Sequence, residues 1–139
     1  MAKIFQFFMI KAPVATVYKN LTEQAGLAAW WTDKTEAKPE VGAILKFHFG
    51  PDYHKEIKVI ALEPNKKVEW ECLVGDPEWM DTKITFDLEE KDGKTHVHFT
   101  HDGWKDYSHL FARCSFDWSG FMRSLRDLSE GKPGQPYKN

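Results

Sequence analysis

The fold is decided by residues 106–130, which read DYSHLFARCSFDWSGFMRSLRDLSE. Apolar side chains recur in this segment at spacings of three and four, the period of one face of an α-helix. They are Phe111, Cys114, Trp118, Phe121, Met122, Leu125 and Leu128. Gly131 and Pro133 follow and end the predicted helix. A helix of about 23 residues is about 35 Å long, enough to cover a whole sheet.

The middle of the chain has the period of strands. Residues 41–49, 67–74 and 83–88 alternate between apolar and polar side chains, with Val41 and Phe47 sharing one parity. Residues around 54–63 are expected to form another strand, and Val97 and Phe99 continue the next one into Asp102-Gly103. Turn signals separate these runs at Gly50-Pro51-Asp52, Glu63-Pro64-Asn65, Gly75-Asp76-Pro77 and Asp92-Gly93. Such alternation predicts an antiparallel sheet with one covered face and one wet face.

The N-terminal segment predicts a strand and two short helices. Residues 3–11 are dense in Phe and Ile and favour a strand. Pro13 opens a helix over residues 13–21, and Thr22 is expected to cap a second one in which Gly26 is a weak point. Residues 32–42 are expected to form a loop.

This order of elements predicts an α+β fold. A curved antiparallel sheet of about six or seven strands would wrap around the long C-terminal helix, with the two short helices after the first strand. No linker or repeat divides the chain, so residues 1–139 are expected to form a single domain.

Composition excludes several classes of partner. The chain has 19 Lys and Arg against 21 Asp and Glu, a net charge of −2, so it lacks the basic surface that nucleic-acid binding requires. No apolar run is long enough to span a membrane, and no membrane insertion is expected. Cys72 and Cys114 do not form a disulfide or zinc motif, which favours reduced thiols and a cytoplasmic location.

The aromatic content is the most unusual property of the chain. It holds ten Phe and six Trp residues, which either fill a large core or line a cavity. A sheet curled around one helix often leaves such a cavity. The candidate lining residues are Trp31, Phe47, Trp70, Phe86, Phe99, Trp118 and Met122.

His101 is a further candidate, because it shares its inward parity with Val97 and Phe99. We expect its strand to end at Asp102-Gly103 and its pKa to lie below the ordinary value, since burial disfavours the charged form. His101 either serves as a polar group in the cavity or has its hydrogen bonds satisfied by the backbone near the end of the strand. His96 and His98 have the opposite parity and should face water without a supporting ligand motif. We therefore predict no metal and no cofactor.

No catalytic residue is predicted. The serines of the long helix have no G-x-S-x-G motif, and an apolar setting should raise the pKa of the Cys114 thiol. Trp79 is open to two interpretations: an exposed anchor for a protein partner, or a ring that packs over the cavity mouth.

Several ordered motifs resemble one known family. They are Ile10-Lys11-Ala12-Pro13, Val17-Tyr18, Leu21-Thr22, Trp30-Trp31, Gly75-Asp76-Pro77-Glu78-Trp79, Thr82 with Ile84-Thr85-Phe86, Phe99-Thr100-His101-Asp102-Gly103-Trp104, Trp118 with Ser124-Leu125, and Gly131-Lys132-Pro133-Gly134-Gln135-Pro136. The chain is similar to the helix-grip proteins of the START and birch-pollen-allergen-like superfamily, in the branch related to the activator of the heat-shock chaperone ATPase. It resembles the second domain of that activator, and we expect it to stand alone.

The resemblance implies three alternative functions. The first is binding of an apolar or amphipathic small molecule, such as a lipid, between the sheet and the C-terminal helix. The second is interaction with a chaperone in a stress response, or with another protein. The third is an enzyme of the cyclase or dehydratase type. The chain is expected to be a monomer or a homodimer.

Overall fold

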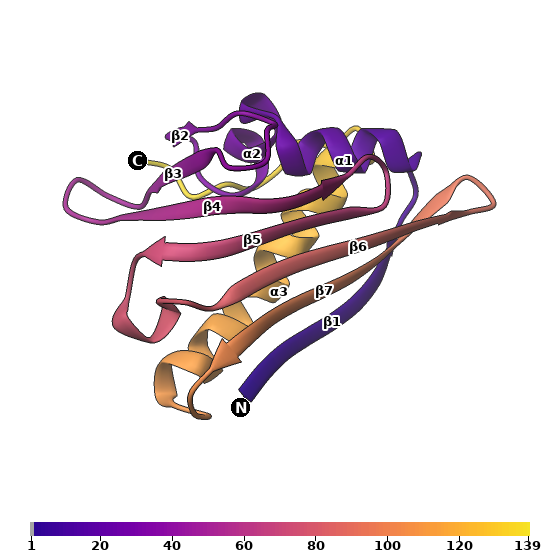
Figure 1. The fold of residues 1–139 in the computed structure, drawn as a ribbon. Helices are drawn as coiled ribbons and strands as arrows, with labels where there is room; N and C mark the ends of the chain where they lie inside the picture. Colours follow the sequence, from indigo (N-terminus) through magenta and orange to yellow (C-terminus); the bar gives the residue numbers. More distant parts are fainter. Residues whose placement is uncertain (1) are drawn as a thin grey trace.

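The structure is a computed structural model that describes residues 2–139, and within them a seven-stranded antiparallel sheet curves around one long helix (Figure 1). The elements in chain order are β1 (Ala2–Ile10), α1 (Val14–Thr22), α2 (Gln24–Trp30), β2 (Thr35–Glu36), β3 (Ile44–His48), β4 (His54–Glu63), β5 (Lys67–Val74), the 3₁₀ turn η1 (Pro77–Trp79), β6 (Lys83–Lys91), β7 (Lys94–Trp104) and α3 (His109–Ser129). This arrangement confirms the predicted α+β helix-grip fold.

The sheet is built mainly from hairpins. Its strand order is β1-β7-β6-β5-β4-β3-β2, so each strand from β2 to β7 lies beside its neighbour in the chain. β1 joins at the edge, antiparallel to β7, with Phe7 opposite His98. The β6–β7 turn has positive φ at both Asp92 (54°) and Gly93 (75°), as the predicted two-residue hairpin requires. The first strand of the chain is therefore one of the two edge strands of the sheet.

α3 packs across the concave face of the sheet (Figure 1). It begins after Ser108, whose Oγ accepts a hydrogen bond from the backbone N–H of Phe111 (3.1 Å) and so caps the helix. The side chains of Cys114, Trp118, Met122 and Leu125 are buried, as the spacing predicted. The apolar face of α3 therefore points toward the sheet and forms part of the core.

The first half of the chain departs from the predictions at several positions. Val41 is exposed rather than inward, because the strand begins only at Ile44. The predicted loop contains the short strand β2, which pairs with β3. Thr22 does not cap the second helix: it ends α1, and its Oγ1 donates to the carbonyl oxygen of Tyr18 (2.9 Å).

Two glycines also differ from expectation. A Cβ atom at Gly26 would lie 2.5 Å from Cα of Asn20, so α1 and α2 can approach each other only because this residue has no side chain. It is a packing requirement rather than a weak point. β7 does not end at Asp102-Gly103 but continues to Trp104, with Gly103 in the left-handed region (φ 94°).

The core is a chain of aromatic rings. Trp31 stacks on Trp70 with ring centroids 6.0 Å apart, Trp70 meets Phe86 edge-on at 5.2 Å, and Phe86 contacts Phe99 at 5.3 Å. Phe99 in turn contacts Trp118 of α3 at 4.7 Å. Sheet and helix are thus joined by ring contacts. Among residues 2–139, none of the helices combines the length and the hydropathy of a membrane span.

Candidate functional site

A cavity of about 660 Å³ lies between residues 113–123 of α3 and the end of the sheet where β3 is connected to β4, with η1 beside it. Its lining is aromatic and apolar with a few charged groups. The lining residues are Trp31, Phe49, Tyr53, Lys55, Asp76, Trp79, Arg113, Cys114, Phe116, Asp117, Trp118, Gly120, Phe121, Arg123, Gln135 and Tyr137. A space of this size suits a small organic molecule.

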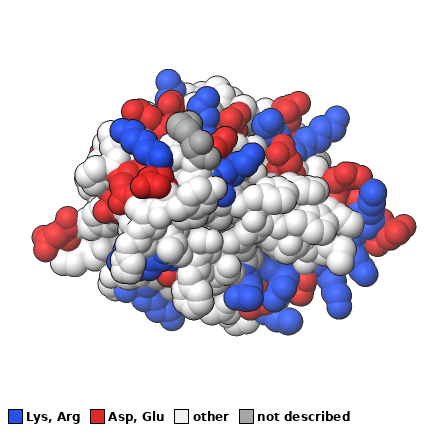
Figure 2. Space-filling model, turned by 90° about the horizontal axis from the view of Figure 1, so that it is seen from below, with Lys and Arg blue, Asp and Glu red and all other residues white. Residues whose placement is uncertain are grey.

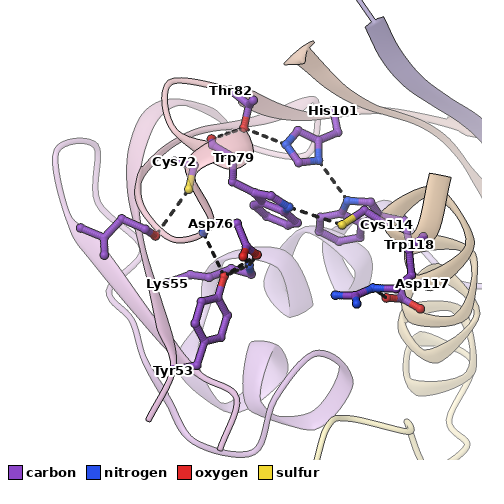
Figure 3. Close-up of polar contacts among 12 residues, drawn as sticks. Tyr53, Lys55, Cys72, Asp76, Trp79, Thr82, His101, Cys114, Asp117 and Trp118 are labelled. Carbon is purple, nitrogen blue, oxygen red and sulfur yellow. Dashed lines mark hydrogen bonds and ion pairs between the residues drawn. The ribbon is translucent and has the colours of Figure 1, made fainter. Parts of the chain in front are cut away.

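Lys55 is the most unusual residue of the cavity. It shares its parity on β4 with Ile57 and Val59, and this places a lysine on the covered face with only 7% of its surface exposed. Its Nζ donates to the Tyr53 hydroxyl (2.6 Å) and lies 3.8 Å from the centre of the Trp79 ring (Figure 3). Burial lowers the pKa of Lys55, and the carboxylate of Asp76 opposes that shift.

The Tyr53 hydroxyl organises the polar end of the cavity. It donates to Oδ2 of Asp76 (2.9 Å) and accepts from the backbone N–H of Asp76 (3.1 Å) as well as from Lys55 (Figure 3). Burial, followed by the hydrogen bond to Asp76, raises the pKa of Tyr53 above its ordinary value. The hydroxyl therefore stays protonated, and its one donor and both acceptor positions are occupied.

Two tryptophans and a cysteine form the floor of the cavity. Trp79 stacks on Trp118 at a centroid distance of 6.0 Å, and its Nε1 donates to Sγ of Cys114 (3.4 Å). Trp79 is only 4% exposed, so the interpretation as an exposed anchor is wrong. Burial raises the pKa of Cys114, which keeps it a thiol rather than a reactive thiolate.

His101 is fully buried, and its hydrogen bonds define its tautomer. Nε1 of Trp118 is a donor only, so Nδ1 of His101 accepts its hydrogen bond (3.1 Å). Nε2 therefore carries the proton and donates to Oγ1 of Thr82 (2.8 Å), which donates to the carbonyl oxygen of Trp79 (2.6 Å) (Figure 3). Burial lowers the pKa of His101 to about 3. Both ring nitrogens are thus used within the structure.

The sequence-predicted lining residues divide into two groups. Trp31 and Trp118 line the cavity. The other six lie outside the lining and are buried in the core, where most of them pack against those two rings: Phe47, Trp70, Phe86, Phe99, His101 and Met122. The predicted lining is therefore correct for the two tryptophans, whereas the other six side chains belong to the closely packed core.

Sequence reasoning missed the polar end of the cavity and the contribution of the C-terminal tail. Lys55 could have been found from its parity with the apolar positions of its strand. The tail is held by Ser124, whose Oγ donates to the carbonyl oxygen of Trp30 (2.9 Å) and accepts from the backbone N–H of Gln135 (2.6 Å). Gln135 and Tyr137 then complete the lining, and the sequence carries no periodic signal for this.

The outer face of the sheet holds the remaining histidines that were considered. His96 and His98 are half-buried there beside Phe7, whose ring centroid lies 4.7 Å from that of His98. Among residues 2–139, no group of three or more His, Cys, Asp or Glu side chains is placed to hold a metal ion.

Comparison with known proteins assigns the family. Residues 11–130 match the family described as Activator of Hsp90 ATPase homolog 1-like protein. The chain belongs to this family. The solution structure of the Aha1 dimer from Colwellia psychrerythraea is 36% identical, with a TM-score of 0.88, over 96% of this chain and 100% of that one.

More distant structures share the fold. Protein MLL2253 from Mesorhizobium loti is 22% identical with a TM-score of 0.79, covering 91% of this chain and 96% of its own. DynU16, a putative protein in the dynemicin biosynthetic locus, is 21% identical with a TM-score of 0.79, over 99% of this chain and 51% of that one. A comparison with curated proteins found no match.

Proposed function

We propose that this protein binds an apolar or amphipathic small molecule in the cavity between the curved sheet and α3. The observation that carries the proposal is the cavity itself: about 660 Å³, walled largely by aromatic rings. Ligand sites in proteins are typically concave, mainly apolar and furnished with a few placed polar groups. Lys55, Tyr53 and Asp76 supply such groups at one end.

A fluorescent probe tests this function directly. N-phenyl-1-naphthylamine, a neutral aromatic dye, should bind saturably in the micromolar range and quench tryptophan emission, because Trp31, Trp79 and Trp118 line the cavity. Cys114→Phe should fill the space and weaken binding by about tenfold or more. Ala112→Phe is the matched control, since Ala112 is exposed on the same helix and outside the lining.

Either of two results would contradict the proposal. Wild-type protein that binds no apolar probe saturably would leave only a packed core and a surface hollow. Binding that is equally strong in Cys114→Phe and Ala112→Phe would place the dye elsewhere on the protein.

A second candidate function is pairing with another copy of this chain through the outer face of β1. Phe5, Phe7 and Met9 project from this edge strand with 61%, 51% and 49% of their surfaces exposed. Figure 2, which shows the molecule from below, has a broad stretch without Lys, Arg, Asp or Glu side chains on this side. An exposed apolar patch on an edge strand is a typical contact surface. The 36% identical relative from Colwellia psychrerythraea is a dimer, which supports this candidate.

Light scattering after size-exclusion chromatography tests the pairing. We expect a dimer for the wild type and a monomer for Phe7→Glu. Val41→Glu, which changes an apolar residue away from β1 that is at least as exposed as Phe7, should remain a dimer. A monomeric wild type at high protein concentration would rule out self-pairing, and the chaperone would then be the next partner to test on this face.

A further inference from the structure

The buried ammonium group of Lys55 should make the cavity prefer ligands that carry a negative charge. We infer that the ligand is an amphipathic acid, whose carboxylate binds the ammonium of Lys55 while its apolar body lies among the aromatic rings. This inference rests on the proposed cavity-binding function and adds the chemical class of the ligand.

The hydrogen bonds of Lys55 are incomplete. An ammonium group has three N–H donors. Within residues 2–139 the Lys55 ammonium makes one hydrogen bond, to Tyr53. Oδ2 of Asp76 lies 3.9 Å away, close enough for an ion pair but too far for a second hydrogen bond. A buried ion pair repays the cost of desolvation only when the remaining N–H donors also find acceptors. A carboxylate oxygen in the adjoining cavity would supply such an acceptor.

The charges around the cavity favour an anion. Its lining holds the cations Lys55, Arg113 and Arg123 against the anions Asp76 and Asp117, so 3 − 2 = +1. Both anions are paired within the lining: Asp76 accepts from Tyr53 and lies 3.9 Å from Lys55, and Asp117 lies 4.0 Å from Arg113. A ligand anion therefore meets an excess of positive charge.

A cationic ligand fits this cavity poorly. Aromatic rings attract cations to their faces, and Trp79 offers such a face. The Lys55 ammonium already occupies it at 3.8 Å from the ring centre. A second positive charge at this end of the cavity would be repelled by Lys55.

The apolar lining fixes the orientation of the ligand. Phe121 and Trp118 of α3, with Trp31 and Phe49 opposite, supply rings to the walls of the same cavity that Lys55 lines. An apolar chain or ring system would bury its surface against these side chains, and its acidic end would lie at Lys55. The arrangement thus calls for one headgroup and one apolar body.

A series of ligands with one tail and three headgroups tests the inference. Dodecanoate, dodecan-1-ol and dodecyltrimethylammonium would each be titrated, below their micelle concentrations, against protein loaded with N-phenyl-1-naphthylamine. For the wild type, dodecanoate should displace the dye at a concentration about tenfold or more below that of the alcohol, because a hydrogen-bonded charge pair adds to the same apolar contact. The cationic ligand should be the weakest.

Two lysine variants locate the effect. Lys55→Met keeps the length of the side chain and removes its charge, so dodecanoate should lose about tenfold in affinity while dodecan-1-ol changes by less than about twofold. Lys58→Met is the matched control, because Lys58 lies on the same strand but is exposed on the opposite face. It should leave the whole series unchanged.

The outcomes separate this inference from the cavity function itself. Equal displacement by dodecanoate and dodecan-1-ol in the wild type would overturn the acidic headgroup and leave the cavity as an apolar site. A wild type that binds neither the dye nor any of the three ligands would overturn cavity binding. If Lys55→Met does not fold, the wild-type series alone decides, because it needs no variant.

Discussion

Two polar clusters, each built around a buried ionisable side chain, lie on opposite sides of the Trp79 ring, and they differ in how completely their hydrogen-bond donors and acceptors are used (Figure 3). In the closed cluster, His101, Thr82 and Trp118 use one another's donors and acceptors, and the imidazole is neutral. In the open cluster, Lys55, Tyr53 and Asp76 leave N–H donors of an ammonium facing a cavity. The ionisable group at the centre of each cluster is buried, His101 with 0% and Lys55 with 7% of its surface exposed. Hydrogen-bond completeness therefore separates the structural imidazole from the ammonium that is a candidate binding group.

The largest effect is expected at Trp118, which belongs to the closed cluster and also lines the cavity. Trp118→Ala should lower the free energy of unfolding by about 3–5 kcal/mol, the usual cost of deleting a large buried aromatic side chain. Urea denaturation followed by far-ultraviolet circular dichroism would measure it. A loss below about 1 kcal/mol would mean that the ring is a loose cavity wall and not part of the packed core.

The closed cluster should also make stability depend on pH. The pKa of His101 is about 3 in the folded protein and about 6.5 in the unfolded chain, so between these values only the unfolded chain binds the proton. The contribution of His101 to stability is therefore fully present above pH 6.5 and is lost as the pH drops toward 3, by about 1.4 kcal/mol for each pH unit. Urea denaturation between pH 7 and pH 4.5 should show a steeper loss for the wild type than for His101→Phe. Equal slopes would show that His101 is not held neutral by the fold.

Thr82 tests whether the closed cluster depends on each of its hydrogen bonds. Thr82→Val keeps the shape of the side chain but leaves the Nε2–H of His101 without an acceptor, and should cost about 1–3 kcal/mol of stability. Thr85→Val, a half-buried position on β6, is the control and should change stability much less. Both can be measured in the same denaturation assay. Matching values for the two variants would contradict a special role for Thr82.

The smallest effect on stability is expected in the open cluster. Lys55→Met removes a charge that the fold must desolvate, and replaces it with an apolar side chain of similar length. These changes nearly cancel, so the free energy of unfolding should change by less than about 1 kcal/mol in either direction. Thermal unfolding would show this. A loss of several kcal/mol would mean that the ion pair of Lys55 with Asp76 stabilises the fold, and that Lys55 is a structural residue.

Local patterns explain why much of the fold was predictable. The predicted strand over residues 54–63 matches β4, and the stripe from Cys114 to Leu125 is buried on α3. Periodicity reports which side of an element faces the core, and it needs only neighbouring residues. The errors at Val41 and Thr22 arose at element ends, where tertiary pairing decides the boundary.

The candidate site was less predictable. The parity of a strand shows that a side chain points toward the core, but it does not show which residues or which cavity that side chain meets there. His101 was correctly placed inside, but the partners that occupy its nitrogens come from Thr82 and Trp118, 19 and 17 positions away. The inward parity of Lys55 was readable from its strand, whereas the cavity beside it was not.

The sequence by itself determined the order of the elements, the face that each presents to the core and the family motifs along the chain. Only the tertiary structure decided which inward positions pack solidly and which border a space. The cavity requires α3, η1 and the C-terminal tail to meet, and the tail is seated where a Cβ atom at Gly134 would lie 2.2 Å from the carbonyl oxygen of Ala29. Contacts between such distant segments depend on shape in three dimensions, which no periodicity along the chain encodes.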